Sequence, residues 1–547
     1  MLNRRDFLLS TLLASATAAL GTRATAAAPD TPDLWLNRLT FGATAEARDS
    51  FRSLGPAAWL DDQLSRPARD DELSARLAAA RLHIAYEAGD DGAAGSWEAV
   101  DEDRPLTLLD ADPASLLPLI DWSVAMDYNE RLRPAEEVIA ASLIRAVHAP
   151  AQLREVMTQF WHDHFNVHSE KDEYVANFFP AYDAGLRDRA FGNFRDLLGF
   201  VATSPAMLVY LTNDESRASP ANENFARELL ELHTLGAGVY MNDRVAHWSE
   251  VPGAAEGLAQ GYIDEDVYEV ARCFTGWTIG DGRWVAEGAT TPKTGLFAYV
   301  EGWHDPYQKR VLGRDFPSHR APLADGEEVL DILATHPATA RFVCTKIARR
   351  LLADDPAPDL VDRLAAVFLG AADAPDQMAQ VIRALATDPA FAAPPERLRR
   401  PFEFLAALLR ATGAEVASRE QGWVWNLARA GWRQHAFPPP TGHPDRNGDW
   451  ETGLVLLRLT ELALYAQDDW FGLVPAGYAG RLPPAARDVA AIARHWGKAL
   501  TGAAPDISSL AAAEIDPGWQ PEGDDERHAV SALTVAMAAL TPQFLYR

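Results

Sequence analysis

Apolar residues recur at intervals of three and four along most of the chain, which is the spacing of amphipathic helices. Helices are expected near residues 34–42, 55–64, 134–148, 326–353, 359–371, 375–388, 396–413, 451–466, 485–500 and 530–540, with another beginning after Pro150. The stretches without this periodicity are an acidic surface loop at 85–114, irregular loops or a small hairpin at 236–265 and 280–326, and a long loop at 414–450. The pattern predicts a mainly α fold, a large multi-helix domain with irregular loops and at most a small β element.

The first 28 residues have the order of an export signal. Arg4 and Arg5 precede an apolar run from Leu8 to Leu20, and small residues suited to signal peptidase follow at 24–28. The paired arginines favour the twin-arginine route, with an ordinary secretory signal or an uncleaved anchor as alternatives. We therefore expect the twin-arginine translocase as a partner and a periplasmic or secreted location.

The remaining residues, 29–547, are expected to form a single large helical domain or two lobes with a boundary near 236–326. No later stretch approaches the roughly 18 consecutive apolar residues of a membrane-spanning helix. The 50 Lys and Arg residues face 78 Asp and Glu residues, giving a formal net charge of -28. A surface of that sign repels phosphate backbones, so nucleic acid is not an expected partner.

Three of the fourteen histidines, His162, His164 and His168, fall within residues 160–168, among aromatic and apolar neighbours. His164 follows Phe160 by four residues and shares the buried face of its helix. His162 lies about 200° from His164 on an ideal helix, so the two share a metal ion only if the helix ends there. His164 and His168 are the better pair if it continues. The alternative is a core helix whose histidines bond each other or the backbone.

A second helix is predicted over residues 219–236, between an N-cap serine and a terminating glycine. Glu228 lies at the edge of its buried face and His233 within that face. A buried carboxylate and a buried imidazole need partners, and a metal ion is one. The alternative is a surface pair of Arg227 with Glu231, together with a structural arginine bonded to Glu228.

A loop at 303–306 supplies His304 and Asp305, which are freer to converge on a site than helical residues are. The two cysteines, Cys273 and Cys344, sit in apolar helical patterns and are expected to be small buried residues, with one disulfide as the alternative.

Several motifs are spread along nearly the whole mature chain. They are LNRLTFG at 36–42, FWHDHF at 160–165, NFARELLELHTLG at 224–236, Asp266-Val267 with ARCFTGW at 271–277, His304-Asp305, and HPATA at 336–340. With these motifs the chain resembles the exported bacterial proteins of the domain-of-unknown-function 1800 family. The resemblance implies a mostly helical fold, frequent twin-arginine signals and frequent pairing with a sulfatase-like exported family, and it supplies no activity. It also implies that the positions of His162, His164, Glu228 and His304 recur in the family.

The leading hypothesis is an exported metal-dependent enzyme that binds a divalent cation of unspecified identity. The expected ligands are His162, His164, Glu228 and His304, with His233 and Asp305 as supporting or acid/base groups. Such a mixed set suits hydrolysis or oxygen chemistry, and the spacing does not choose between them. The competing hypothesis is a non-catalytic exported interaction or assembly protein that works with a sulfatase-like partner.

Overall fold

The computed structural model describes residues 31–417, 419, 421–466, 473–474, 477–502 and 516–547. The predicted export signal, residues 1–28, lies outside the described residues. The described chain is mainly α, as the periodicity predicts, and its strands form only two-stranded sheets. The α-helices are α2 (Thr31–Leu39), α3 (Ala45–Leu54), α4 (Pro56–Ser65), α5 (Asp71–Ala79), α6 (Pro113–Leu116), α7 (Tyr128–His148), α8 (Gln152–His164), α9 (Glu173–Asp188), α10 (Phe194–Thr203), α11 (Pro205–Tyr210), α12 (Glu223–Glu228), α13 (Asp264–Cys273), α14 (Ala324–Ala334), α15 (Pro337–Leu351), α16 (Pro358–Gly370), α17 (Gln377–Thr387), α18 (Pro401–Thr412), α19 (Gly422–Arg429), α20 (Asn447–Trp450), α21 (Gly453–Tyr465), α22 (Tyr478–Arg481), α23 (Val489–Thr501), α25 (Gly523–Ala539) and α26 (Pro542–Leu545).

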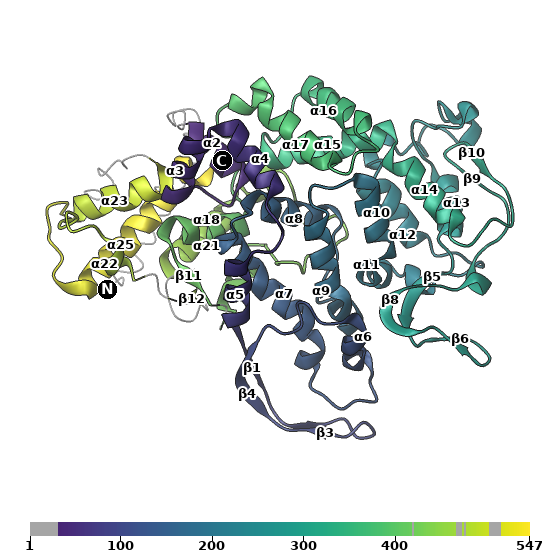
Figure 1. Ribbon diagram of the computed structural model, residues 1–547, viewed down its shortest axis with the longest axis horizontal. Helices are drawn as coiled ribbons and strands as arrows, with labels where there is room; N and C mark the ends of the chain where they lie inside the picture. The colour runs from purple at the N-terminus through teal and green to yellow at the C-terminus, as the bar shows by residue number, and fades with distance from the viewer. Residues whose placement is uncertain (1–30, 418, 420, 467–472, 475–476, 503–515) are drawn as a thin grey trace.

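Helices α7, α8 and α9 lie at the centre of the molecule, where α7 packs against both α9 and α18 (Figure 1). Helix α7 begins at an Asp127 cap, whose side chain accepts from the Asn129 amide, and it buries an apolar face that includes Val138 and Leu143. Helices α15, α16 and α17 pack together beside this centre. Helix α25 packs against α21, α22 and α23, and α22 and α23 lie at one end of the molecule (Figure 1). Buried apolar residues from Leu36 to Tyr546 form one continuous cluster.

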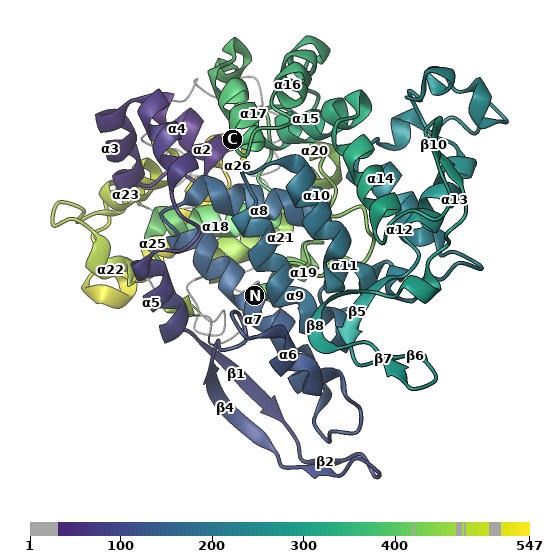
Figure 2. The same ribbon diagram turned by 45° about the vertical axis from the view of Figure 1, so that its right-hand side comes forward.

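The strands pair as antiparallel hairpins and short ribbons. They are β1 (Arg81–Tyr86) with β4 (Val100–Pro105), β2 (Gly89–Asp90) with β3 (Ser96–Trp97), β5 (Trp277–Asp281) with β8 (Lys293–Tyr299), β6 (Trp284–Ala286) with β7 (Ala289–Thr290), β9 (Lys309–Val311) with β10 (Arg314–Phe316), and β11 (Glu415–Val416) with β12 (Leu473–Val474). The hairpin of β1 and β4 extends away from the helices (Figure 2).

The prediction of an acidic surface loop at 85–114 is wrong up to residue 105, because the end of β1 and all of β2, β3 and β4 lie there. Strand β1 starts before it and continues into it, with Arg81 opposite Pro105 and Tyr86 opposite Val100. Leu82 and Ile84 are buried on one face of β1, so the period-two alternation of a half-buried strand is present there. The acidic composition that follows hid this short strand signal.

The helix predicted over 219–236 is also shorter than expected. Asn222 takes the N-cap position of α12, because its side chain accepts from the Asn224 amide at 3.0 Å. After Glu228 the chain continues as a π-helical turn over Leu229–His233, where the Thr234 hydroxyl donates to the Leu229 carbonyl at 2.6 Å.

Both cysteines are buried and unpaired, as expected for small core residues. Among the described residues, no helix combines the length and the apolar character that crossing a membrane requires.

Candidate functional site

The last three residues before the end of α8 point into three different surroundings. Successive helical residues are about 100° apart, so His162, Asp163 and His164 cannot share one face. His162 faces a buried polar cluster, Asp163 faces a basic pocket, and His164 faces the apolar core. The motif FWHDHF therefore joins three regions instead of supplying two ligands to one ion.

The buried polar cluster contains His162, Asp183 of α9 and His435. Among the described residues, this is the only group of three or more His, Cys, Asp or Glu side chains whose ligand atoms lie within 4.8 Å of one another. His162 Nε2 lies 3.0 Å from Asp183 Oδ1, and the rings of His162 and His435 are 4.1 Å apart. Of the four predicted ligands only His162 belongs to it, so the structure does not assemble the predicted set.

Two arginines already bind the carboxylate of this cluster. Arg187 donates to both oxygens of Asp183 at 2.8 and 2.9 Å, and Arg145 donates to Oδ2 at 3.0 Å. Arg187 also bonds both oxygens of Glu155 at 3.2 Å. Burial alone would raise the pKa of Asp183, but the guanidinium groups hold it well below its usual range. The two buried arginines and two buried carboxylates cancel in charge, so a divalent cation would add uncompensated charge to a buried site.

His435 leaves one hydrogen-bonding group open in this cluster. The Gln434 amide nitrogen, which is a donor, lies 3.0 Å from His435 Nε2, so the ring hydrogen belongs on Nδ1. Within the described chain Nδ1 has no partner. His435 also has a left-handed φ of 55°, which is costly for a residue other than glycine. A cavity of about 10 Å³ lined by His162 and His435 has room for about one water molecule.

His164 and His233 are buried near each other, with ring centres 6.5 Å apart, and their predicted roles as a ligand and a supporting or acid/base group stay predictions. His164 Nδ1 and both ring nitrogens of His233 have no hydrogen-bond partner in the described part of the chain. His164 Nε2 donates to the His233 carbonyl at 3.0 Å, and its ring stacks on that of Phe160. Burial lowers the pKa of His164 well below its usual value and that of His233 to about 3, so both rings are neutral. The condition for pairing His164 with His168, a helix that continues past His164, is not met, because α8 ends at His164.

Glu228 is half-buried at the end of α12. Burial, followed by the neighbouring Glu231, raises the pKa of Glu228. Arg227 does not form the expected pair with Glu231; it reaches Glu223 at 3.5 Å and Asp264 at 3.2 Å. The structure therefore separates Glu228 from the His162 cluster.

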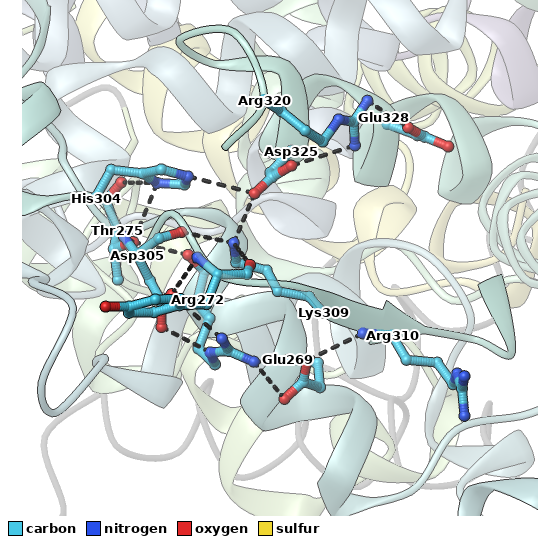
Figure 3. A network of polar contacts seen from close by, with 11 residues as sticks. Glu269, Arg272, Thr275, His304, Asp305, Lys309, Arg310, Arg320, Asp325 and Glu328 are labelled. Carbon is cyan, nitrogen blue, oxygen red and sulfur yellow. Dashed lines mark hydrogen bonds and ion pairs between the residues drawn. The ribbon is translucent and has the colours of Figure 1, made fainter. Parts of the chain in front are cut away.

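His304 and Asp305 belong to a network of ion pairs that ties the loop before β9 to α13 and α14 (Figure 3). His304 Nε2 lies 3.3 Å from Asp325 Oδ2, and its Nδ1 lies 2.9 Å from the Thr275 carbonyl. Both oxygens of Asp305 accept from Arg272, at 2.7 and 3.2 Å. Burial would raise the pKa of Asp305, but its hydrogen bond with Arg272 gives a net lowering.

The amine of Lys309 lies at the centre of the same network and is fully buried. It donates to Asp325 at 2.7 Å and to the carbonyls of Asp305 and Tyr307 at 2.6 and 2.9 Å. Arg320 pairs with Asp325 and Glu328 from the other side (Figure 3). The network provides partners for most of its polar atoms, but Arg320 Nη1 and Asp325 Oδ1, which lie 3.2 Å apart as an ion pair, form no hydrogen bond within the described part of the chain. The predicted roles of His304 as a ligand and Asp305 as an acid/base group stay predictions.

A pocket of about 350 Å³ lies on the Asp163 side of α8, and we call it the basic pocket. Five cationic side chains and two carboxylates line it, with phenylalanine and proline rings between them. The lining residues are Phe160, Asp163, Phe342, Lys346, Arg349, Arg350, Arg397, Arg400, Phe437, Pro439, Thr441, Gly442, His443, Pro444 and Asp445. The excess of cations stands out in a chain whose net charge is -28.

The arginines of the basic pocket each have a carboxylate partner. Arg349 pairs with Asp445 at 2.9 Å and Arg400 pairs with Asp163 at 3.0 Å. Two carboxylates behind the wall complete the set: Glu403 lies 2.9 Å from Arg350 and 3.0 Å from Arg400, and Asp354 contacts Arg397.

Several N–H donors nevertheless stay open at this wall. Within the described part of the chain, Arg350 Nε and Nη1 and Arg397 Nε have no hydrogen-bond acceptor although they are buried. Burial lowers the pKa of Arg350 to about 10, so its guanidinium is still charged at neutral pH. Open donors on buried cations are costly, and an anion in the adjacent pocket would offset the positive charge of this wall.

Lys346 has no carboxylate partner at hydrogen-bonding distance among the described residues. Its ammonium lies 5.5 Å from the centre of the Phe342 ring, and burial lowers its pKa to about 8. Both ring nitrogens of His443, in contrast, have hydrogen-bond partners. Nδ1 bonds Asp163 at 3.0 Å and Nε2 accepts from the Arg433 amide, while the ring stacks on Trp432 with 3.8 Å between the ring centres.

Sequence reasoning missed the basic pocket, although its signal is present. Arg349 and Arg350 follow Lys346 by three and four residues, which places both beside Lys346 on one face of α15. Arg397 and Arg400 come from a run of basic residues just before Pro401. Asp183 and His435 carried no local signal, because they meet His162 only through tertiary packing.

Comparison with known proteins gives a family and no activity. The model of the family described as "Protein of unknown function (DUF1800)" matches residues 34–546, so the chain belongs to this family. No curated protein and no solved structure matches the chain.

Proposed function

We propose that this member of the DUF1800 family binds an anionic small molecule in the basic pocket. The observation that carries the proposal is the group of five cationic side chains that line the pocket, among them a Lys346 ammonium that has no carboxylate partner among the described residues. Phosphate, sulfate and carboxylate groups are acceptors that match guanidinium donors.

The walls of the pocket also indicate what the rest of the ligand is like. Phe160, Phe342, Phe437 and Pro439 supply apolar surface next to the cations. A pocket with apolar walls and few polar groups binds the body of a ligand by burial and orients it through its charged end. The volume of about 350 Å³ suits a small organic anion. We therefore expect an aryl or alkyl phosphate, sulfate or carboxylate to bind better than the inorganic ion.

The test is calorimetry and thermal unfolding of the mature chain with phosphate, sulfate and phenyl phosphate, against sodium chloride at the same ionic strength. Ligand at 100 times its Kd stabilises the fold by about 2.7 kcal/mol. Lys346→Gln and Arg349→Gln should each weaken binding about tenfold or more, since a hydrogen bond to a charged group contributes about 1.5–3 kcal/mol. Lys498→Gln, an exposed lysine on α23, is the matched control. No stabilisation beyond sodium chloride would overturn the proposal.

The metal-dependent enzyme remains a second proposal, supported by the ligand spacing of His162, Asp183 and His435. Its weakness is that Arg145 and Arg187 already bind the carboxylate. Elemental analysis of protein purified without chelator tests the metal-dependent enzyme separately from anion binding. A stoichiometric metal that is lost in His435→Ala would support this second proposal; metal-free protein with an unchanged thermal midpoint after chelation would exclude it.

Export by the twin-arginine route, a periplasmic or secreted location and a sulfatase-like partner also remain proposals, supported only by sequence. Arg4→Lys with Arg5→Lys should retain the protein in the cytoplasm, because the translocase distinguishes guanidinium pairs from other charges. Unchanged secretion of this double variant would favour the general secretory route.

A further inference from the structure

We propose that Lys346 is a nucleophilic amine that binds an anionic aldehyde or ketone covalently, as an imine, in the basic pocket. This inference rests on the proposed anion binding and adds the chemical class of the ligand. It concerns the one cation of the pocket wall that can act as more than a charge.

The surroundings of Lys346 differ from those of the four arginines. Each arginine is paired with a carboxylate, whereas the Lys346 ammonium faces the pocket with no acceptor among the described residues. The ring of Phe342 lies on one side of it, at 5.5 Å. An amine that is held in a pocket without a carboxylate partner is free to meet a ligand.

The chemistry of the residue supports the same conclusion. Arginine stays protonated in proteins, so none of the four arginines can become a nucleophile. Lysine can, once it loses its proton, and desolvation beside other cations is how such lysines are activated. Burial lowers the pKa of Lys346 to about 8, although the charges of Asp445 and Asp163 act in the opposite direction, and Arg349 adds a smaller lowering. Part of the amine is therefore uncharged near neutral pH.

The proposed step balances without any other reactant. The ammonium releases a proton to solvent, and the nitrogen lone pair then attacks the carbonyl carbon to form a C–N bond. The carbonyl oxygen takes up the two hydrogens that remain on the nitrogen, by way of solvent, and leaves as water when its C–O bond breaks. The product is a carbon–nitrogen double bond to Lys346. The guanidinium groups that line the pocket, among them those of Arg349 and Arg397, would hold the anionic group of the ligand meanwhile.

The small number of lysines in the chain makes imine formation at Lys346 easy to detect. There are only five lysines: Lys171, Lys293, Lys309, Lys346 and Lys498. Lys293 and Lys498 are exposed and serve as internal references, and Lys309 is fully buried. Pyridoxal 5′-phosphate, an aldehyde that carries a phosphate, is the probe. It is added to the mature chain, reduced with borohydride, and mapped by peptide mass spectrometry.

We expect Lys346 to be labelled at least tenfold more than either exposed lysine, with a rate that rises through a pH midpoint near 8. Pyridoxal, which lacks the phosphate, should lose this preference. Lys346→Gln should remove the imine absorbance with an unchanged thermal midpoint or a higher one, while Lys498→Gln keeps the absorbance.

Pyridoxine 5′-phosphate, which has the phosphate and no aldehyde, separates the two proposals. If it binds and phosphate competes with it, but Lys346 is labelled no faster than Lys293, covalent binding is overturned and anion binding stands. If neither phosphate compound binds, the proposed function and this inference are overturned together.

Discussion

Two lysines of this chain, Lys309 and Lys346, lie among charged side chains with opposite results. Lys309 is fully buried and donates to three oxygens at 2.6–2.9 Å, one of them on the carboxylate of Asp325. Lys346 lines a pocket, and no acceptor among the described residues binds it. Its arginine neighbours keep open donors as well. The first lysine completes a structural network, and the second leaves charge available for a ligand.

The comparison shows which feature of a charged cluster indicates binding. Both regions are rich in arginine and aspartate, and both contain a histidine bonded to an aspartate, His304 with Asp325 and His443 with Asp163. The number of charged residues therefore does not separate them. A neighbouring cavity does not separate them either, because Lys309 also lines one, of about 710 Å³. The lysine itself does: the Lys309 ammonium has three oxygen acceptors, whereas the Lys346 ammonium has none among the described residues, and a charged donor without an acceptor is costly unless a ligand or water supplies one.

The largest expected effect is the loss of the Lys309 amine. Lys309→Met should lower the free energy of unfolding by about 3–5 kcal/mol, because it leaves Asp325 buried with fewer compensating charges. Denaturant unfolding of the mature chain measures this change. Lys498→Met, at an exposed site, should stay within about 0.5 kcal/mol of the parent. A loss below about 1 kcal/mol for Lys309→Met would show that Arg320 and His304 balance Asp325 alone.

The same substitution at Lys346 should act in the opposite direction. Lys346→Met removes a cation whose pKa is lowered from 10.5 to about 8 by burial, so the folded state no longer holds a disfavoured charge. The free energy of unfolding at pH 7 should rise by about 1–3 kcal/mol, since one pKa unit corresponds to about 1.4 kcal/mol. A destabilised Lys346→Met protein would mean that the ammonium has a structural partner.

The pH dependence sharpens this second prediction. The folded-state pKa of Lys346 lies below its ordinary value, so between about pH 8 and 10.5 the unfolded chain binds more protons than the folded chain. The contribution of Lys346 to stability therefore rises with pH in this window, by up to about 1.4 kcal/mol per pH unit. The stability difference between the parent and Lys346→Met should shrink from pH 8 to 10.5. A constant difference would place the pKa elsewhere.

The smallest expected effect is at Glu228. Burial and Glu231 raise its pKa, so its charge is mildly unfavourable in the folded state. Glu228→Gln should therefore raise the stability at pH 7 by less than about 1 kcal/mol and leave phosphate binding unchanged. A loss of several kcal/mol would instead reveal a cation that depends on this carboxylate.

Much of the helical fold could be read from the sequence. The spacing of apolar residues located α4, the helix after Pro150, α21 and the closing helix, because a three- to four-residue repeat determines which face is buried. Secondary-structure prediction failed where the apolar repeat was short or was interrupted by charged residues. Strand β1 spans six residues beside an acidic stretch, and Asn222 displaced Ser219 as the cap of α12.

The sequence by itself determined that His162, Asp163 and His164 occupy different sides of one helix end and that Lys346, Arg349 and Arg350 share a face of α15. Only the tertiary structure decided what each side meets. Asp183 comes from α9 and His435 from the loop after α19, and the wall of the basic pocket joins α8, α15 and the residues around 397–400 and 437–445. Helical periodicity fixes the direction of a side chain, but its partners depend on how distant helices pack, because hydrogen bonds and ion pairs act only over a few ångströms.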